Sequence, residues 1–139
     1  MIVSLLLGLQ ALPLGPTLPV QGKVVARAEP GIPLPLSRLR RILRRCPVEK
    51  GSWAQALEIR LVSVATMATF KPTRPDHARR GRYLRASPPH PAMIYIAKGP
   101  DLNLSLLHEW LHHQDAVVGR ERTEAAIEMA AKACNTKAE

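Results

Sequence analysis

Apolar residues recur with the period of an α-helix between Leu104 and Val118. At about 100° per residue they fall on one broad arc, made of Leu104, Leu106, Leu107, Trp110, Leu111, Val117 and Val118. Asp101 or Asn103 can cap the start of this helix, and Gly119 is a stop signal after its last apolar residue. The pattern predicts an amphipathic helix that packs one face against a core.

A second helical pattern begins at Ser37, a residue that can cap a helix. Its apolar positions have spacings of three and four residues, and Pro47 ends it; they are Leu39, Ile42, Leu43 and Cys46. The remaining faces carry Arg38, Arg40, Arg41, Arg44 and Arg45. A helix that packs on a sheet and shows its arginines to water is favoured over a helix that binds nucleic acid or a membrane.

Alternating apolar and polar residues predict strands between these helices. Leu57, Ile59 and Leu61 begin a run of β-forming residues, which predicts a long strand or a bent pair from about 55 to 70. Shorter strands are predicted at 82–86 and 93–97, separated by proline-rich loops. With a further helix from 121 to 134, the chain predicts an α+β domain with an N-terminal helix and a short antiparallel or mixed sheet.

The first thirty residues are predicted to be a flexible or signal-like extension, followed by one domain at 31–139. Met1–Val20 is apolar, but prolines and a glycine interrupt it, so it is too short for a transmembrane anchor. No Lys or Arg precedes it, and the first Ala-x-Ala site, at 26–28, is distant. Cys46 and Cys134 are the two cysteines of the chain, which fits reduced thiols in a cytoplasmic protein. The alternative is an exported protein in which the two cysteines could pair.

The charge of the chain is strongly asymmetric. Its formal net charge is +9, yet residues 23–85 carry fifteen Lys and Arg against four acids, and residues 86–139 carry five against seven. Such a basic half can attract an acidic or DNA-bound protein substrate, nucleic acid or a membrane surface. One alternative function is therefore a basic nucleic-acid-binding module that uses the arginine helix and segment 79–82, although aromatic residues do not interleave with these cations.

Candidate chemistry lies inside the helix at 104–118, in the sequence His108-Glu109-Trp110-Leu111-His112. A spacing of four places both histidines on one helix face, where two imidazoles can hold one zinc ion. Glu109 lies between them and can reach a water on that metal. The alternative is a surface helix with solvated histidines.

Catalytic zinc typically has three protein ligands and a water, so a third ligand is expected. The metzincin extension of the motif is excluded, because Asp115 and Val118 stand where it needs glycine and histidine. The helix that follows offers three glutamates instead. In order of preference they are Glu124, which borders the apolar strip of that helix, then Glu121, then Glu128.

The motif and the Glu-Ala segment from Thr123 to Ala130 resemble the gluzincin branch of zinc peptidases. Within that branch they are similar to small peptidases of the ImmA/IrrE type, which cleave regulatory repressors. The resemblance covers roughly residues 92–134 and implies a small zincin-like domain with a Zn2+ cofactor, an active-site helix and a C-terminal ligand helix. It also implies that strand 93–97 borders the cleft and pairs with an extended substrate.

The resulting expectation is a peptidase that cleaves a protein substrate with a metal-activated water, with Glu109 moving the proton. Asp115 is a candidate to orient a ligand imidazole. Candidate donors to the oxyanion are His113, which adjoins a ligand and ranks first, and Tyr83, Tyr95, His77 and His90. A second alternative is a protein that zinc stabilises without catalysis.

Overall fold

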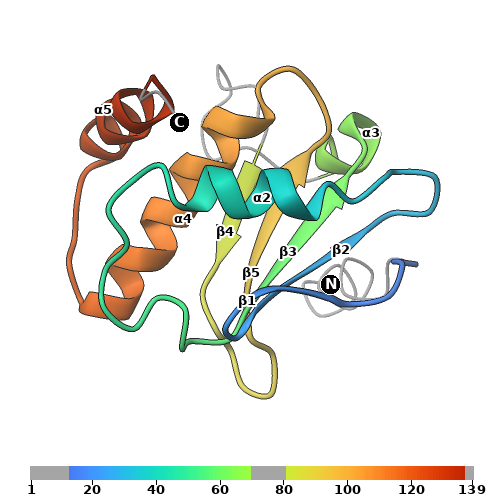
Figure 1. The fold of residues 1–139 in the computed structure, drawn as a ribbon, viewed down its shortest axis with the longest axis horizontal. Coiled ribbons are helices and arrows are strands. Elements are labelled where there is room, and N and C mark those ends of the chain that lie inside the picture. The colour runs from blue at the N-terminus through green and yellow to red at the C-terminus, as the bar shows by residue number, and fades with distance from the viewer. Residues whose placement is uncertain (1–12, 70–80, 137–139) are drawn as a thin grey trace.

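The computed structural model describes residues 13–69 and 81–136, and its centre is a five-stranded sheet (Figure 1). The strands are β1 (Leu18–Gln21), β2 (Val24–Ala28), β3 (Leu57–Val62), β4 (Gly81–Leu84) and β5 (Ala92–Ala97). Their order in the sheet is β1-β2-β3-β5-β4. The inner strands β2, β3 and β5 run parallel, while β1 and β4 pair antiparallel with their neighbours. The predicted α+β class with a mixed sheet is confirmed.

Two helices cover one face of the sheet. They are α2 (Leu36–Leu43) and α4 (Leu102–Val118), whereas α5 (Glu124–Asn135) lies beyond α4 at the periphery (Figure 1). A short helix, α3 (Val64–Met67), follows β3. None of the helices in the described ranges is long and apolar enough to cross a membrane.

The main hydrophobic core fills the space between the sheet and these two helices. Alternate residues of a strand face one side of a sheet, so β2, β3 and β5 each supply three core residues. The fully buried members include Val24, Ala26, Leu57, Ile59, Ile94 and Ile96 from the sheet, Leu39, Ile42 and Leu43 from α2, and Leu106, Leu107 and Trp110 from α4. Packing therefore fixes the orientation of α4: its apolar arc faces the sheet, and the residues at the edge of the arc face outward.

The opposite face of the sheet carries a smaller apolar cluster. Its buried members are Val62, Met67, Met93, Tyr95 and Ala97, and Leu84 packs against them. β3 and β5 are therefore buried along their whole length. Burial on both faces explains the continuous apolar run of β5, whereas β3 places the ion pair of Glu58 and Arg60 on the second face.

The predicted strand from 55 to 70 is wrong beyond Val62. Ser63 has extended backbone angles, and its side-chain oxygen accepts a hydrogen bond from the amide of Thr66 at 3.1 Å. A serine in this arrangement caps a helix, so the chain turns into α3 where the pattern of β-forming residues continues. The predicted strands at 82–86 and 93–97 correspond to β4 and β5, and the predicted helix at 37–46 corresponds to α2.

The predicted N-terminal extension contains two strands that belong to the domain. β1 and β2 form a hairpin on the sheet, joined by a turn at Gly22, whose φ is 56°. A Cβ at Gly22 would lie 2.3 Å from the carbonyl oxygen of Trp53, so the turn requires glycine. The boundary at residue 30 therefore needs correction, while the signal-like run within residues 1–12 lies outside the described residues.

The two cysteines form a disulfide, contrary to the prediction of reduced thiols. Cys46 follows α2 and Cys134 lies in the last turn of α5, with Cα atoms 5.1 Å apart and a sequence separation of 88. The bond joins the segment after α2 to the last turn of α5. Bonded cysteines are more typical of oxidising compartments, and the cytoplasmic location stays a prediction.

Candidate metal centre

The structure places the two histidines of the motif on the outer edge of α4. His108 and His112 are one turn apart, with ring centroids 5.0 Å from each other. Their side chains are 16% and 23% exposed, so both are held by packing and both still reach the surface. This matches the helix-edge position that the apolar arc predicts.

Glu124 spans both imidazoles from the first turn of α5. Its two carboxylate oxygens lie 2.9 Å from His108 Nε2 and 2.8 Å from His112 Nε2. α5 begins here because Thr123 caps it, its hydroxyl accepting from the amide of Ala126. The Glu124 side chain is 63% exposed, more than its predicted place beside the apolar strip suggests, so the three groups meet on an open surface.

The spacing of these donors suits a tetrahedral zinc ion after a small adjustment. Zinc bonds of about 2.1 Å to nitrogen and oxygen would place the donor atoms about 3.4 Å apart. The observed distances of 2.8 and 2.9 Å are shorter, so the carboxylate would withdraw by roughly 0.5 Å to admit the ion. Two imidazoles and a carboxylate are also a donor set that zinc commonly takes in enzymes.

Glu128 approaches His108 from the other side. One of its carboxylate oxygens lies 2.8 Å from His108 Nδ1, and Lys132 Nζ lies 3.8 Å from the other. Because a carboxylate only accepts hydrogen bonds, this contact favours a proton on Nδ1 and leaves the Nε2 lone pair for a metal. The sequence ranked Glu128 last, yet its spacing of four from Glu124 placed it on the same side of α5.

The structure does not bring Glu121 to the site. It lies exposed in the loop before α5, because the helix begins at Glu124 and not at residue 121. Among the described side chains, Glu124 and Glu128 are the carboxylates of this segment that contact an imidazole.

Glu109 lies between the sheet and the histidines. One of its oxygens and one nitrogen of each imidazole lie within 4.8 Å of one another, so it belongs to the same cluster. It is 9% exposed and packs against Gly81 of β4, where an added Cβ would be 3.1 Å from its Cγ and Oε2. The acid of the motif is thus held beside a strand at the edge of the sheet.

Burial also affects the protonation of the His112 imidazole. Loss of solvent lowers the pKa of His112, and the neighbouring Glu124 carboxylate opposes this effect without cancelling it. The neutral imidazole is the form that binds a metal.

His113 does not take part in the cluster, contrary to its rank as the first candidate donor to an oxyanion. Its ring is 2% exposed, stacks on Trp110 and has Nδ1 3.0 Å from the hydroxyl of Tyr83. Burial lowers the pKa of His113 to about 4, so it is neutral at physiological pH. The two residues are interior partners that fasten α4 to β4.

The other candidate donors lie elsewhere or outside the described residues. The Tyr95 hydroxyl accepts a hydrogen bond from Arg60 at 2.7 Å, and its ring belongs to the cluster on the opposite face of the sheet. His90 is exposed in the turn between β4 and β5. His77 lies outside the described residues.

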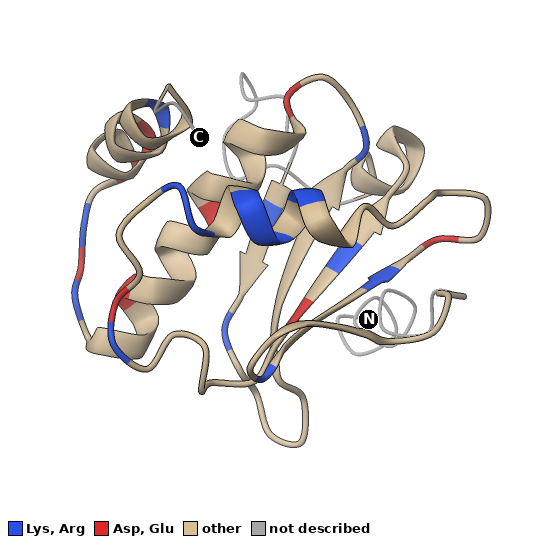
Figure 2. Ribbon diagram, viewed as in Figure 1, with Lys and Arg blue, Asp and Glu red and all other residues tan. Residues whose placement is uncertain are grey.

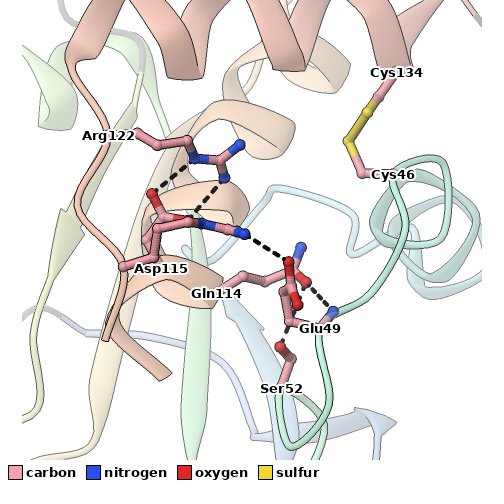
Figure 3. A network of polar contacts seen from close by, with 8 residues as sticks. Cys46, Glu49, Ser52, Gln114, Asp115, Arg122 and Cys134 are labelled. Carbon is pink, nitrogen blue, oxygen red and sulfur yellow. Dashed lines mark hydrogen bonds and ion pairs between the residues drawn. A yellow bond between two sulfur atoms is a disulfide. The ribbon is translucent and has the colours of Figure 1, made fainter. Parts of the chain in front are cut away.

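Asp115 orients two arginines and not an imidazole. Its carboxylate accepts hydrogen bonds from Arg120 at 2.9 Å and from Arg122 at 2.8 and 3.0 Å (Figure 3). Burial alone would raise the pKa of Asp115, but these guanidinium bonds outweigh it and lower the pKa. The side chain therefore fixes the loop that leads from α4 to α5, a role that the sequence did not predict.

We expect Asp115→Asn to destabilise the fold by about 2 kcal/mol at pH 7, since it removes bonds to two charged but partly exposed partners. In the parent, this contribution is present above the unfolded-state pKa of 3.8. It is lost as the pH falls through the lower pKa of Asp115 in the folded state. Urea unfolding of both proteins between pH 7 and 3 measures it, with Asp101→Asn, an exposed acid, as control. Equal stability of variant and parent at pH 7 would contradict the role.

The strand expected to bind substrate is not at an edge. β5, which spans the predicted 93–97, pairs with β3 on one side and β4 on the other. β4 is the strand at this end of the sheet in the described part of the chain, and it lies next to α4.

The arginines of α2 have partners within the fold. Arg38 donates to Asn103 of α4, Arg40 to the carbonyl of Val20, Arg44 to Gln21, and Arg45 to Asn135 of α5. Figure 2 shows the basic positions along α2 and the acidic positions on α4 and α5. These bonds tie α2, and Arg44 and Arg45 directly after it, to β1, α4 and α5, so these arginines have a structural role.

Comparison with known protein families, with curated proteins and with solved structures finds no match for this chain.

Proposed function

We propose that this protein is a zinc-dependent peptidase, in which His108, His112 and Glu124 bind the metal and Glu109 is the general base. One observation carries the proposal: a carboxylate from a separate helix spans the Nε2 atoms of both motif histidines, at 2.9 and 2.8 Å. A chance occurrence of the five-residue pattern would not require a third donor at this place. The His, His and Glu set is the one that the resemblance to gluzincin peptidases implies.

A bound zinc ion would polarise the scissile carbonyl and lower the pKa of a water molecule. Glu109 is placed to accept a proton from that water and to pass it to the leaving amine, because its carboxylate lies within 4.8 Å of both imidazoles without belonging to the ligand set proposed here. Its packing against Gly81 limits its freedom, which keeps the base oriented.

The proposed substrate is a protein or peptide segment in extended form. In the described part of the chain, β4 is the terminal strand of the sheet next to Glu109, and a terminal strand is where an extended segment can add to a sheet. The net charge of +9 favours acidic segments. Backbone pairing supplies affinity without sequence preference, so specificity would come from side chains beside the strand.

Hydrolysis of fluorescently labelled casein tests the proposal. We expect cleavage by the zinc-loaded protein, loss of cleavage with a chelator such as 1,10-phenanthroline, and recovery when zinc is restored. A protein that carries one zinc ion and cleaves neither casein nor a mixed peptide library would contradict peptidase activity and favour a zinc ion that only stabilises the fold.

A further inference from the structure

α5 carries both glutamates that contact the imidazoles, yet its buried face is narrow. Within this helix, the buried residues are Ile127, Ala131 and Cys134. α5 lies at the periphery and packs on α4 (Figure 1). The position of Glu124 therefore depends on how firmly the two ends of α5 are held.

Each end of α5 has its own attachment. Before the helix, Arg120 and Arg122 bind Asp115 of α4. At the other end Cys134 is bonded to Cys46, and the neighbouring Arg45 donates to Asn135 at 2.8 Å. The disulfide is the covalent part of the second attachment.

The segment that carries Cys46 is itself fixed to α4. The amide of Glu49 donates to the side-chain oxygen of Gln114, and the Glu49 carboxylate accepts from Arg120 at 2.9 Å (Figure 3). Cys46 is 2% exposed within the main core. The disulfide therefore ties α5 to a rigid point of the domain and not to a free loop.

We propose that the Cys46–Cys134 disulfide is a redox-sensitive latch that holds Glu124 against His108 and His112. This inference rests on the proposed metal centre. Reduction by a dithiol transfers two electrons and two protons: the S–S bond breaks, two cysteine thiols form, and the dithiol becomes a disulfide. Freed at its C-terminal end, α5 opens more often, and the third donor leaves the imidazole pair more often.

Cysteine-to-serine substitution at both positions tests the latch without thiols that could bind zinc themselves. We expect Cys46→Ser/Cys134→Ser to bind zinc about 10- to 100-fold more weakly than the oxidised parent, the range seen when a group that orients a metal ligand is lost. Competition with a chromophoric chelator measures the affinity. Hydrogen exchange gives a readout independent of metal: amides of α5 should exchange faster in the variant, while those of β3 and β5 keep their protection.

A double-mutant cycle ties the effect to Glu124. In a Glu124→Ala background, removal of the disulfide should weaken zinc binding less than it does in the parent, because the ligand that the latch positions is already absent and only the contact of Glu128 with His108 is left to lose. Equal affinity of parent and cysteine variant would overturn the latch and leave the metal centre standing. Absence of zinc binding by the oxidised parent would overturn both.

If the serine variant does not fold, a chemically reduced form of the parent replaces it. This form is prepared with dithiothreitol, alkylated with iodoacetamide and then separated from both reagents. Faster exchange confined to α5, together with weaker zinc binding, supports the latch in this form too. Loss of protection throughout the sheet in both forms would contradict it, since the disulfide would then stabilise the whole domain and not one helix.

Discussion

Glu109→Gln should bind zinc as tightly as the parent and cleave peptide bonds about 10²- to 10⁴-fold more slowly, the range expected when a general base is lost. Glutamine keeps the size of the side chain beside Gly81, so the packing against β4 is retained. It cannot accept a proton from water at neutral pH. Initial rates of casein hydrolysis at equal zinc occupancy measure the effect.

The matched control is Glu121→Gln, which makes the same change at an exposed residue outside the site. It should keep full activity. Comparable turnover by Glu109→Gln and the parent would contradict the proposed mechanism. A large loss of zinc by Glu109→Gln would show instead that Glu109 is a ligand, which its presence in the His108, Glu109 and His112 cluster allows.

Glu124→Ala should weaken zinc binding more than about 100-fold, because it removes a direct ligand, whereas loss of a group that only orients a ligand costs about 10- to 100-fold. Glu124 reaches the Nε2 atoms of both histidines, which no other described glutamate does. Its side chain is 63% exposed, so the substitution leaves no cavity in the core. Chelator competition gives the affinity, and circular dichroism checks the fold.

The other two glutamates of this segment are internal controls. Glu128→Ala should weaken zinc binding by about 10- to 100-fold, since Glu128 contacts Nδ1 of His108 and not the nitrogen that faces Glu124. Glu121→Ala should have no effect. A larger loss for Glu128→Ala than for Glu124→Ala would reassign the third ligand.

Local features of the sequence predicted the part of the site that lies within one helix. The spacing of His108 and His112 follows from helical periodicity, and so does the burial of the middle of the apolar arc, Leu106, Leu107, Trp110 and Leu111. Val118, at the end of the predicted arc, is 43% exposed instead. Gly119, with φ of 73°, ends the helix where a stop signal was predicted. These predictions hold because neighbours along one helix determine them.

Features that depend on contacts between different elements of the fold were mispredicted. Asp115 looked one turn away from a ligand histidine, but the loop brings Arg120 and Arg122 to it. His113 adjoins a ligand in sequence, and yet the turn of the helix points it into the core against Tyr83. The place of β4 outside β5 in the sheet is likewise a matter of topology, which alternation along a single strand does not encode.

Zinc content tests the central claim most directly. We expect the purified protein to contain about one zinc ion per chain, as three protein ligands at one site require, by elemental analysis after gel filtration. His108→Ala and His112→Ala should contain almost none, while His90→Ala, a change at an exposed turn, should match the parent. If the His108 and His112 variants retain as much zinc as the parent, the metal centre described here is not where this protein binds zinc.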